Sequence, residues 1–159
     1  MNMDLQKQGQ LLDGRIKSIQ IISFALLLGA TFTVIIFCAI ADWQAVHQNF
    51  NLLSIIGLGY GAVSVVAALF VPSLFGKDEI DAAQKASSDL QSEKLAGAFL
   101  VKHIIRMALL EGGAFLNAIL FFIEKNMLTL CMAVFLIAMM AMFFPRKNSI
   151  LSWIEANQA

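Results

Sequence analysis

The chain has 159 residues, of which 59% are hydrophobic and 14% are charged, and its mean hydropathy is +0.77. Soluble domains contain about 25% charged residues, so this composition excludes a soluble enzyme, a nucleic-acid-binding protein and a disordered tail. The 11 basic and 11 acidic residues cancel to a formal net charge of zero, which leaves no overall field to attract nucleic acid. The sequence therefore predicts an integral membrane protein whose first partner is the lipid bilayer.

Four apolar segments follow one another along the chain, at residues 18–41, 52–75, 98–123 and 127–145. Each is near or above the roughly 20 residues that a helix needs to cross the hydrocarbon core. Helices are expected because an isolated strand would leave backbone groups unpaired in lipid, and no segment alternates as the strands of a membrane barrel do. The predicted fold is an all-α, integral membrane four-helix bundle.

The positions of lysine and arginine predict the orientation of the helices. Of the 11 Lys and Arg residues, only Lys125 falls in a connection on the outer side. By the positive-inside rule, both termini and the long middle loop face the cytoplasm, most simply at a bacterial inner membrane. Trp43 and Trp153 follow the first and last spans, where interfacial aromatic anchors on opposite faces are expected.

An internal repeat predicts two tandem helical hairpins. A shift of 83 residues places 21–32 over 104–115 with seven identities, and a shift of 73 places 68–72 over 141–145 with both prolines aligned. Parallel repeats of this kind are related by an axis along the membrane normal. The expected segments are a cytoplasmic N-terminal segment, a first hairpin, a loop with the start of a stalk, a second hairpin and an interfacial C-terminal helix, at residues 1–17, 18–75, 76–95, 96–145 and 146–159.

Two polar segments are expected to form helices outside the hydrocarbon. Ser88 and Gln91 have capping-box spacing, so the third helix is predicted to begin in the cytoplasm as a stalk, either solvated or available for docking. After Pro145, a short helix carries Ile150 and Ile154 on one side, which predicts an anchor to the inner leaflet.

Glu111 is the one acidic residue well inside a predicted span. An ionisable group there costs roughly 2.5–3.5 kcal/mol on insertion scales, so it should face the bundle and have a partner. One interpretation is that protonated Glu111 hydrogen-bonds across the bundle and stabilises helix association by about 1 kcal/mol. The candidate partners are Thr31, Thr33, Tyr60 and Asn117. The second interpretation is that Glu111 binds and releases protons or ions.

Further polar residues accompany Glu111 on the third span. At 100° per residue, His103, Arg106 and Asn117 share one arc with Gly113, and Glu111 lies at its margin, so an ion pair within this helix is not expected. Arg106 and His103 are interpreted as interfacial residues, with a substrate-binding patch as the alternative. Asn117 is expected to join helices.

Small residues indicate faces that allow close helix packing. Gly57 and Gly61 have GxxxG spacing in the second span, and Gly112 and Gly113 are expected to act similarly in the third. The partner of the second span is either a helix of the same chain or a second copy.

No metal, cofactor or catalytic motif is predicted. His47 and His103 are separated by a span, and no H-E-x-x-H, G-x-S-x-G or paired carboxylates occur inside the spans. Cys38 and Cys131 lie in apolar runs, where free thiols are the usual outcome, although a disulfide between the first and fourth helices is conceivable.

Two functions are consistent with this pattern. The first is a non-catalytic membrane subunit or scaffold that packs with itself or with a larger complex. The second is a small proton-linked transporter or channel with Glu111 as the protonatable site and with Tyr60 and Asn117 lining its route. A single acid without a second intramembrane charge or a broken helix favours the first.

Overall fold

The computed structural model describes residues 2–74, 80 and 88–157, with side chains placed over 13–74, at 80 and over 91–157. Within that range the protein consists of five α-helices and one short 3-10 helix, so the predicted all-α class is confirmed. The elements in chain order are α1 Asn2–Ile40, η1 Trp43–Ala45, α2 Leu52–Leu74, α4 Ser88–Glu124, α5 Met127–Met142 and α6 Lys147–Asn157. Most of the predicted 76–95 loop and the Ser88 side chain lie outside the described residues.

Three described helices are long and apolar enough to cross a membrane, over Asp13–Ile40, Leu52–Leu74 and Gln91–Glu124. The fourth predicted span is shorter than expected, because α5 has only 16 residues. It reaches the length of a span only together with α6, from which it is bent by 64°. At a rise of 1.5 Å per residue, α5 alone covers about 24 Å of a hydrocarbon core of about 30 Å.

The bend between α5 and α6 is caused by Pro145. A proline has no N–H, so it cannot donate to the carbonyl of Ala141 and continue the helix. That carbonyl instead accepts from the Phe144 N–H at 3.2 Å, and α5 ends at Met142. The helix α5 therefore ends three residues before the predicted boundary at 145.

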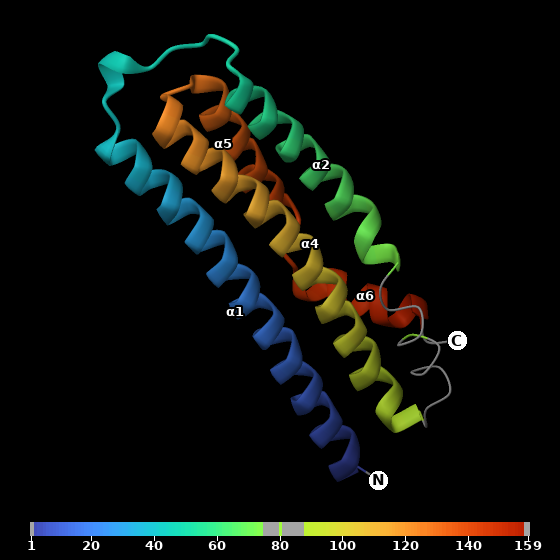
Figure 1. Ribbon diagram of the computed structural model, residues 1–159. Helices are drawn as coiled ribbons and strands as arrows, with labels where there is room; N and C mark the ends of the chain where they lie inside the picture. Colours follow the sequence, from blue (N-terminus) through green and yellow to red (C-terminus); the bar gives the residue numbers. More distant parts are fainter. Residues whose placement is uncertain (1, 75–79, 81–87, 158–159) are drawn as a thin grey trace.

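The helix at the centre of the structure is α4, against which α1, α2, α5 and α6 all pack (Figure 1). The α4–α5 pair forms a hairpin closed by a tight turn, in which Lys125 has a positive φ of 55°. The helices of the predicted first hairpin, α1 and α2, run in opposite directions but pack mainly on α4 instead of on each other (Figure 1). The arrangement around α4 thus depends on two separate faces of that helix.

In the structure, the small-residue face of α2 meets α4 and α5 of the same chain. A Cβ placed on Gly57 would lie 2.6 Å from Leu120 Cδ1, and one on Gly61 would lie 2.7 Å from Met132 Cγ. Such distances are shorter than carbon atoms tolerate. The absence of side chains at these two positions therefore lets α2 approach α4 and α5 closely.

The two adjacent glycines of α4 behave differently from each other. A Cβ on Gly113 would lie 2.8 Å from Ser64 Oγ, whereas one on Gly112 would have no atom within 4 Å. Consecutive helical residues point about 100° apart, so only Gly113 faces α2. In the structure, Gly113 therefore packs closely against α2, whereas Gly112 has open space beside it.

At the end of the molecule that the sequence predicts to be cytoplasmic, three helices pack together around one apolar cluster. Ile150 and Ile154 of α6 are buried against Ile16 and Ile19 of α1 and against the first turns of α4, at Leu95 and Ala96. The apolar side of α6 therefore faces protein, which differs from the predicted leaflet anchor. The first turns of α4 are likewise covered on one face by α1 and α6, because packing the three apolar stripes together removes them from water.

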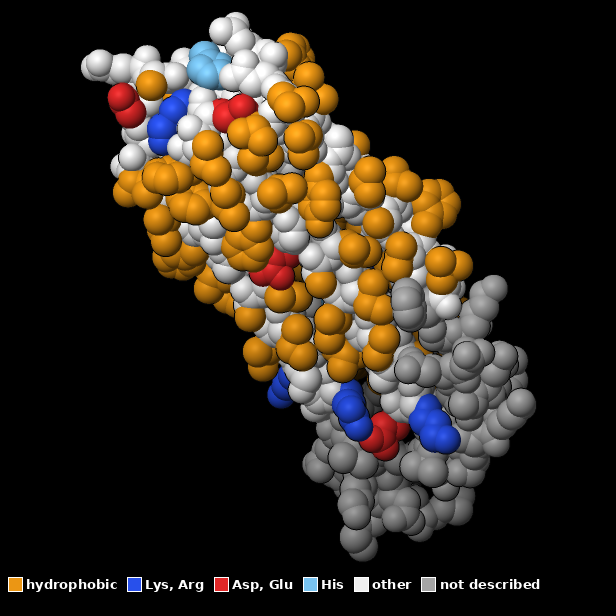
Figure 2. Space-filling view, viewed as in Figure 1, with side chains coloured by type: hydrophobic (Ala, Val, Ile, Leu, Met, Phe, Trp, Pro, Cys, Tyr) orange, Lys and Arg blue, Asp and Glu red, His pale blue; other side chains and the backbone are white. Residues whose placement is uncertain are grey.

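Apolar side chains cover the middle of the molecule, and most basic side chains of the face in view gather at the end that carries both termini (Figure 2). The exposed apolar residues include Ile21, Phe24 and Phe32 on α1 and Val63 and Phe70 on α2. A soluble protein rarely exposes so large a continuous apolar area. The surface therefore supports the prediction of a membrane protein.

We expect Gly113→Ala to lower the free energy of unfolding by about 1–3 kcal/mol, because its methyl group would overlap the Ser64 side chain. Gly112→Ala is the matched control, since that position is open, and it should leave stability unchanged or raise it slightly. Denaturant unfolding in detergent micelles measures both. Equal destabilisation by the two substitutions would contradict the packing described here.

Candidate functional site

Glu111 lies on α4 at the seam with α1. It is half-buried, and a Cβ placed on Gly29 of α1 would lie 3.6 Å from its Oε1 atom. The carboxyl group therefore rests near the α1 backbone, where a glycine leaves room for it. Figure 2 shows an acidic side chain within the apolar band of this face.

The hydroxyl groups expected to bind Glu111 are bonded elsewhere. Thr31 Oγ1 donates to the Leu27 carbonyl at 2.7 Å and Thr33 Oγ1 donates to the Gly29 carbonyl at 3.1 Å, both within α1. Tyr60 is 48% exposed on α2. Within the described part of the chain, Glu111 forms no hydrogen bond or ion pair. Its polar group is thus available to a partner from outside this chain.

His103 joins α4 to α1 through a buried hydrogen bond. Its Nε2 atom lies 2.8 Å from Ser23 Oγ, and the Ser23 hydroxyl donates to the Ile19 carbonyl at 2.7 Å. A serine has one proton, so the hydrogen-bond network assigns His103 the tautomer that donates from Nε2 to Ser23. His103 also stacks on Phe99 with ring centroids 6.0 Å apart. It is an interhelical contact buried inside the protein, which differs from the interfacial position expected from the sequence.

Arg106 joins α4 to α2, and Pro72 explains how. Within α2, the carbonyl of Ala68 would normally accept from the N–H four residues later, but that residue is Pro72. The Nε atom of Arg106 donates to this carbonyl at 3.1 Å, and its guanidinium lies 4.8 Å from the centre of the Phe143 ring. The side chain therefore supplies the donor that proline lacks.

Asn117 is fully buried between α2 and α4. Its Nδ2 group donates to the carbonyls of Gly57 and Gly113, each at 3.0 Å. Its Oδ1 atom is buried without a hydrogen-bond partner in the described structure. Gly57 thus serves twice, because it lets the helices approach and offers its carbonyl to Asn117. The expected role of Asn117 in joining helices agrees with these contacts.

The five candidate polar residues do not form one site. Glu111 and His103 face α1, whereas Arg106 and Asn117 face α2. Tyr60 lies on α2 itself, where its side chain is exposed. His103 lies at the edge of the arc that it shares with Arg106 and Asn117, and from there it contacts α1 instead of α2. A route lined jointly by Glu111, Tyr60 and Asn117 is not formed in this structure.

Sequence reasoning missed a polar cluster at the opposite end from the termini. Asn126, fully buried, donates from Nδ2 to the Asn49 carbonyl and to Ser54 Oγ, both at 2.6 Å. The Ser54 hydroxyl in turn donates to Glu124 Oε2 at 2.6 Å. Asn126 precedes α5, and its Oδ1 accepts from the Leu128 N–H as a helix N-cap. An asparagine directly before an apolar run was the signal available in the sequence.

The same end is closed by backbone pairing. The His47 N–H donates to the Lys125 carbonyl at 3.0 Å, and the His47 carbonyl accepts from the Met127 N–H at 2.9 Å. These bonds hold the connection after α1 against the α4–α5 turn. The cluster therefore holds the helices together at this end, and its role is structural.

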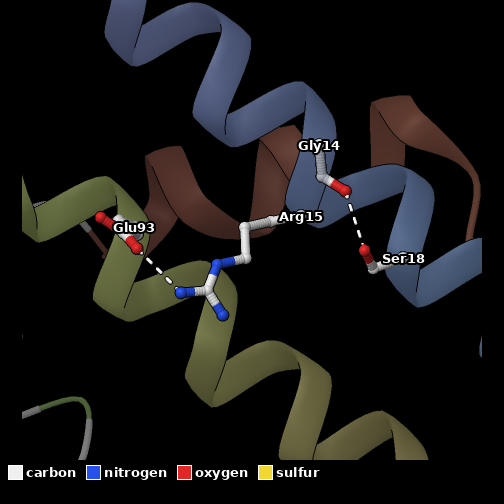
Figure 3. A network of polar contacts seen from close by, with 4 residues as sticks. All are labelled: Gly14, Arg15, Ser18 and Glu93. Carbon is white, nitrogen blue, oxygen red and sulfur yellow. Dashed lines mark hydrogen bonds and ion pairs between the residues drawn. The ribbon is translucent and has the colours of Figure 1, made fainter.

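Two ion pairs join helices at the end that carries the termini. Arg15 of α1 reaches Glu93 of α4 at 2.8 Å, while Ser18 bonds the Gly14 carbonyl within α1 (Figure 3). Lys147 at the start of α6 pairs with Asp13 at 2.8 Å. All four charged side chains are substantially exposed, and such pairs contribute about 0–1 kcal/mol each. Their role is to orient elements already held by the apolar cluster.

No group of three or more His, Cys, Asp or Glu side chains suited to a metal ion occurs among the described residues. Cys38 and Cys131 are free thiols, so the conceivable disulfide is not formed. The candidate site is therefore the half-buried Glu111 at the α1–α4 seam.

The chain matches no family model, and comparisons with curated proteins and with solved structures also give no match.

Ser23→Ala should lower the free energy of unfolding in micelles by about 1 kcal/mol, because it leaves the His103 Nε2–H buried without an acceptor. Ser18→Ala is the control, since the exposed Ser18 hydroxyl bonds only within its own helix. It should change stability by less than about 0.5 kcal/mol. A Ser23→Ala protein as stable as the control would refute the His103 contact.

Arg106→Leu should cost about 1 kcal/mol more in the natural chain than in a Pro72→Ala background. In that background the N–H of residue 72 can bond the Ala68 carbonyl, so Arg106 no longer has to supply the donor that proline lacks. The Phe143 contact is lost equally in both backgrounds and cancels in a double-mutant cycle. Additivity within about 0.3 kcal/mol, measured from the unfolding of the four proteins, would contradict the proposed coupling.

Proposed function

We propose that this protein is a non-catalytic, multi-pass membrane subunit that assembles with itself or with a larger membrane complex through the seam between α1 and α4. The observation that carries the proposal is the half-buried Glu111 carboxyl, which has no hydrogen-bond or ion-pair partner within the described part of the chain. A polar group in hydrocarbon gains most from a partner that a neighbouring helix supplies.

The position of Glu111 favours association over an internal role. The carboxyl lies beside Gly29, and the neighbouring positions Ala25, Phe32 and Ala108 are exposed and small or apolar. A second helix resting on this seam would bury apolar area and bring a donor to the carboxyl. As an acceptor, the carboxyl group can pair with a basic, amide or hydroxyl donor, and when protonated it can also donate to an amide or hydroxyl oxygen.

We further propose that α1, α2, α4 and α5 form a four-helix membrane bundle of two tandem hairpins, with both termini in the cytoplasm of a bacterial inner membrane. The distribution of Lys and Arg along the sequence supports this orientation. The two ion pairs near the termini place charges of α1, α4 and α6 at one end. The short α5 would require local thinning of the bilayer or tilting of its neighbours.

A proton-linked transporter receives less support from the geometry. Such a protein needs polar groups that line one route, and the candidate residues face different helices. His103, Arg106 and Asn117 already have interhelical partners. They therefore contribute to helix packing.

We expect Glu111→Leu to weaken assembly about fivefold, corresponding to the roughly 1 kcal/mol of an interhelical polar contact. Energy transfer between separately labelled copies in bilayers measures self-association, and native electrophoresis of membrane extracts measures a larger complex. Thr33→Val is the control, because the Thr33 hydroxyl bonds only within α1. It should leave assembly unchanged.

Glu111→Gln separates a hydrogen-bonding role from proton exchange. The amide retains donors and acceptors, so it should preserve most of the association that leucine removes. Unchanged complex size and energy transfer in Glu111→Leu would refute the proposal. Proton flux through proteoliposomes that Glu111→Gln abolishes would replace it with the transporter function.

A further inference from the structure

A groove opens on the surface at the end that carries the termini, between α1 and the bend before α6. The described residues that line it are Lys17, Gln20, Ile21, Phe24 and Phe144. Its volume of about 410 Å³ falls in the range of sites for small molecules. The Nε2 group of Gln20 donates to the Pro145 carbonyl at 3.2 Å, which joins the two walls.

The lining changes from charged to apolar along α1. Lys17 is exposed where the apolar run begins, and Ile21 and Phe24 follow one and two turns later on the same helix face, 68% and 56% exposed. In a bilayer, this order corresponds to the headgroup level followed by the acyl chains. Both parts of the groove would therefore contact the same leaflet.

The charges around Lys17 favour an anion. Asp13, one turn earlier, is paired with Lys147 at 2.8 Å, so its carboxylate is shared with another cation. Arg146 is adjacent to Lys147 and exposed. Within the described residues, Lys17 forms no direct ion pair. The local balance of these four side chains is positive.

We propose that this groove binds one anionic phospholipid from the leaflet at the basic end of the protein. The phosphate would lie against the Lys17 ammonium, and an acyl chain would follow Ile21, Phe24 and Phe144. Lipid fits better than a soluble anion because most of the lining is apolar, and anionic lipids attract basic residues near a membrane surface. The site rests on different residues from the function proposed for Glu111, which lies beside Gly29, about three turns of α1 from Lys17 and little more than one turn from Phe24.

The test is native mass spectrometry of the full chain, delipidated in detergent and titrated with phosphatidylglycerol or phosphatidylcholine. We expect the chain to retain phosphatidylglycerol preferentially, and Lys17→Gln to reduce that preference about fivefold, as expected for one surface cation. Phe24→Ala should reduce retention of both lipids. The control is Lys94→Gln, because Lys94 is exposed near the same end but lines a different groove; it should leave the preference unchanged.

Other outcomes of these titrations would contradict the proposed lipid site. Equal retention of the two lipids, or a preference that Lys17→Gln leaves intact, overturns the proposal. Millimolar inorganic phosphate at matched ionic strength should not displace phosphatidylglycerol, because phosphate lacks the acyl-chain contacts. Displacement would show that the groove binds a phosphate group alone and would also overturn the lipid assignment.

Discussion

The structure depends on one constraint, which is that polar groups inside the apolar spans must find partners in the protein. His103 and Arg106 meet it by bonding to Ser23 of α1 and to the Ala68 carbonyl of α2, and Asn117 bonds the Gly57 carbonyl. In lipid, apolar side chains distinguish poorly between another helix and an acyl chain. These polar contacts and the close approach at glycines therefore determine which face of α4 meets α1 and which meets α2.

Glu111 departs from that rule, and the departure links structure to the proposed function. Its neighbours on α4 bond to backbone or hydroxyl groups, whereas its carboxyl remains without a partner among the described residues. The seam it occupies is bordered by exposed apolar positions and by Gly29. A neighbouring helix that covered the seam would supply a partner to this carboxyl, which is the physical basis of the proposed assembly.

The helix positions could be predicted from the sequence, whereas the contacts between helices could be predicted only in part. Length and hydropathy locate α2 almost to the residue, and the spacing of Gly57 and Gly61 indicates its packing face. A helical wheel placed His103 and Arg106 on one arc, but it contains no information about where neighbouring helices lie. The Arg106 contact could be predicted only from the carbonyl that Pro72 leaves without its helical donor. The role of Asn126 could be predicted only from its position as a helix N-cap.

By itself, the sequence determined that the protein is helical and has several helices apolar enough for a membrane, because those properties depend on residues close together in the chain. Only the tertiary structure decided that α4 lies at the centre, that α6 packs its isoleucines on α1 and α4, and that Gly113 faces α2 while Gly112 does not. Apolar segments resemble one another, so their local pattern does not specify their neighbours. Those neighbours are selected by steric fit and by polar bonds between residues 38–80 positions apart.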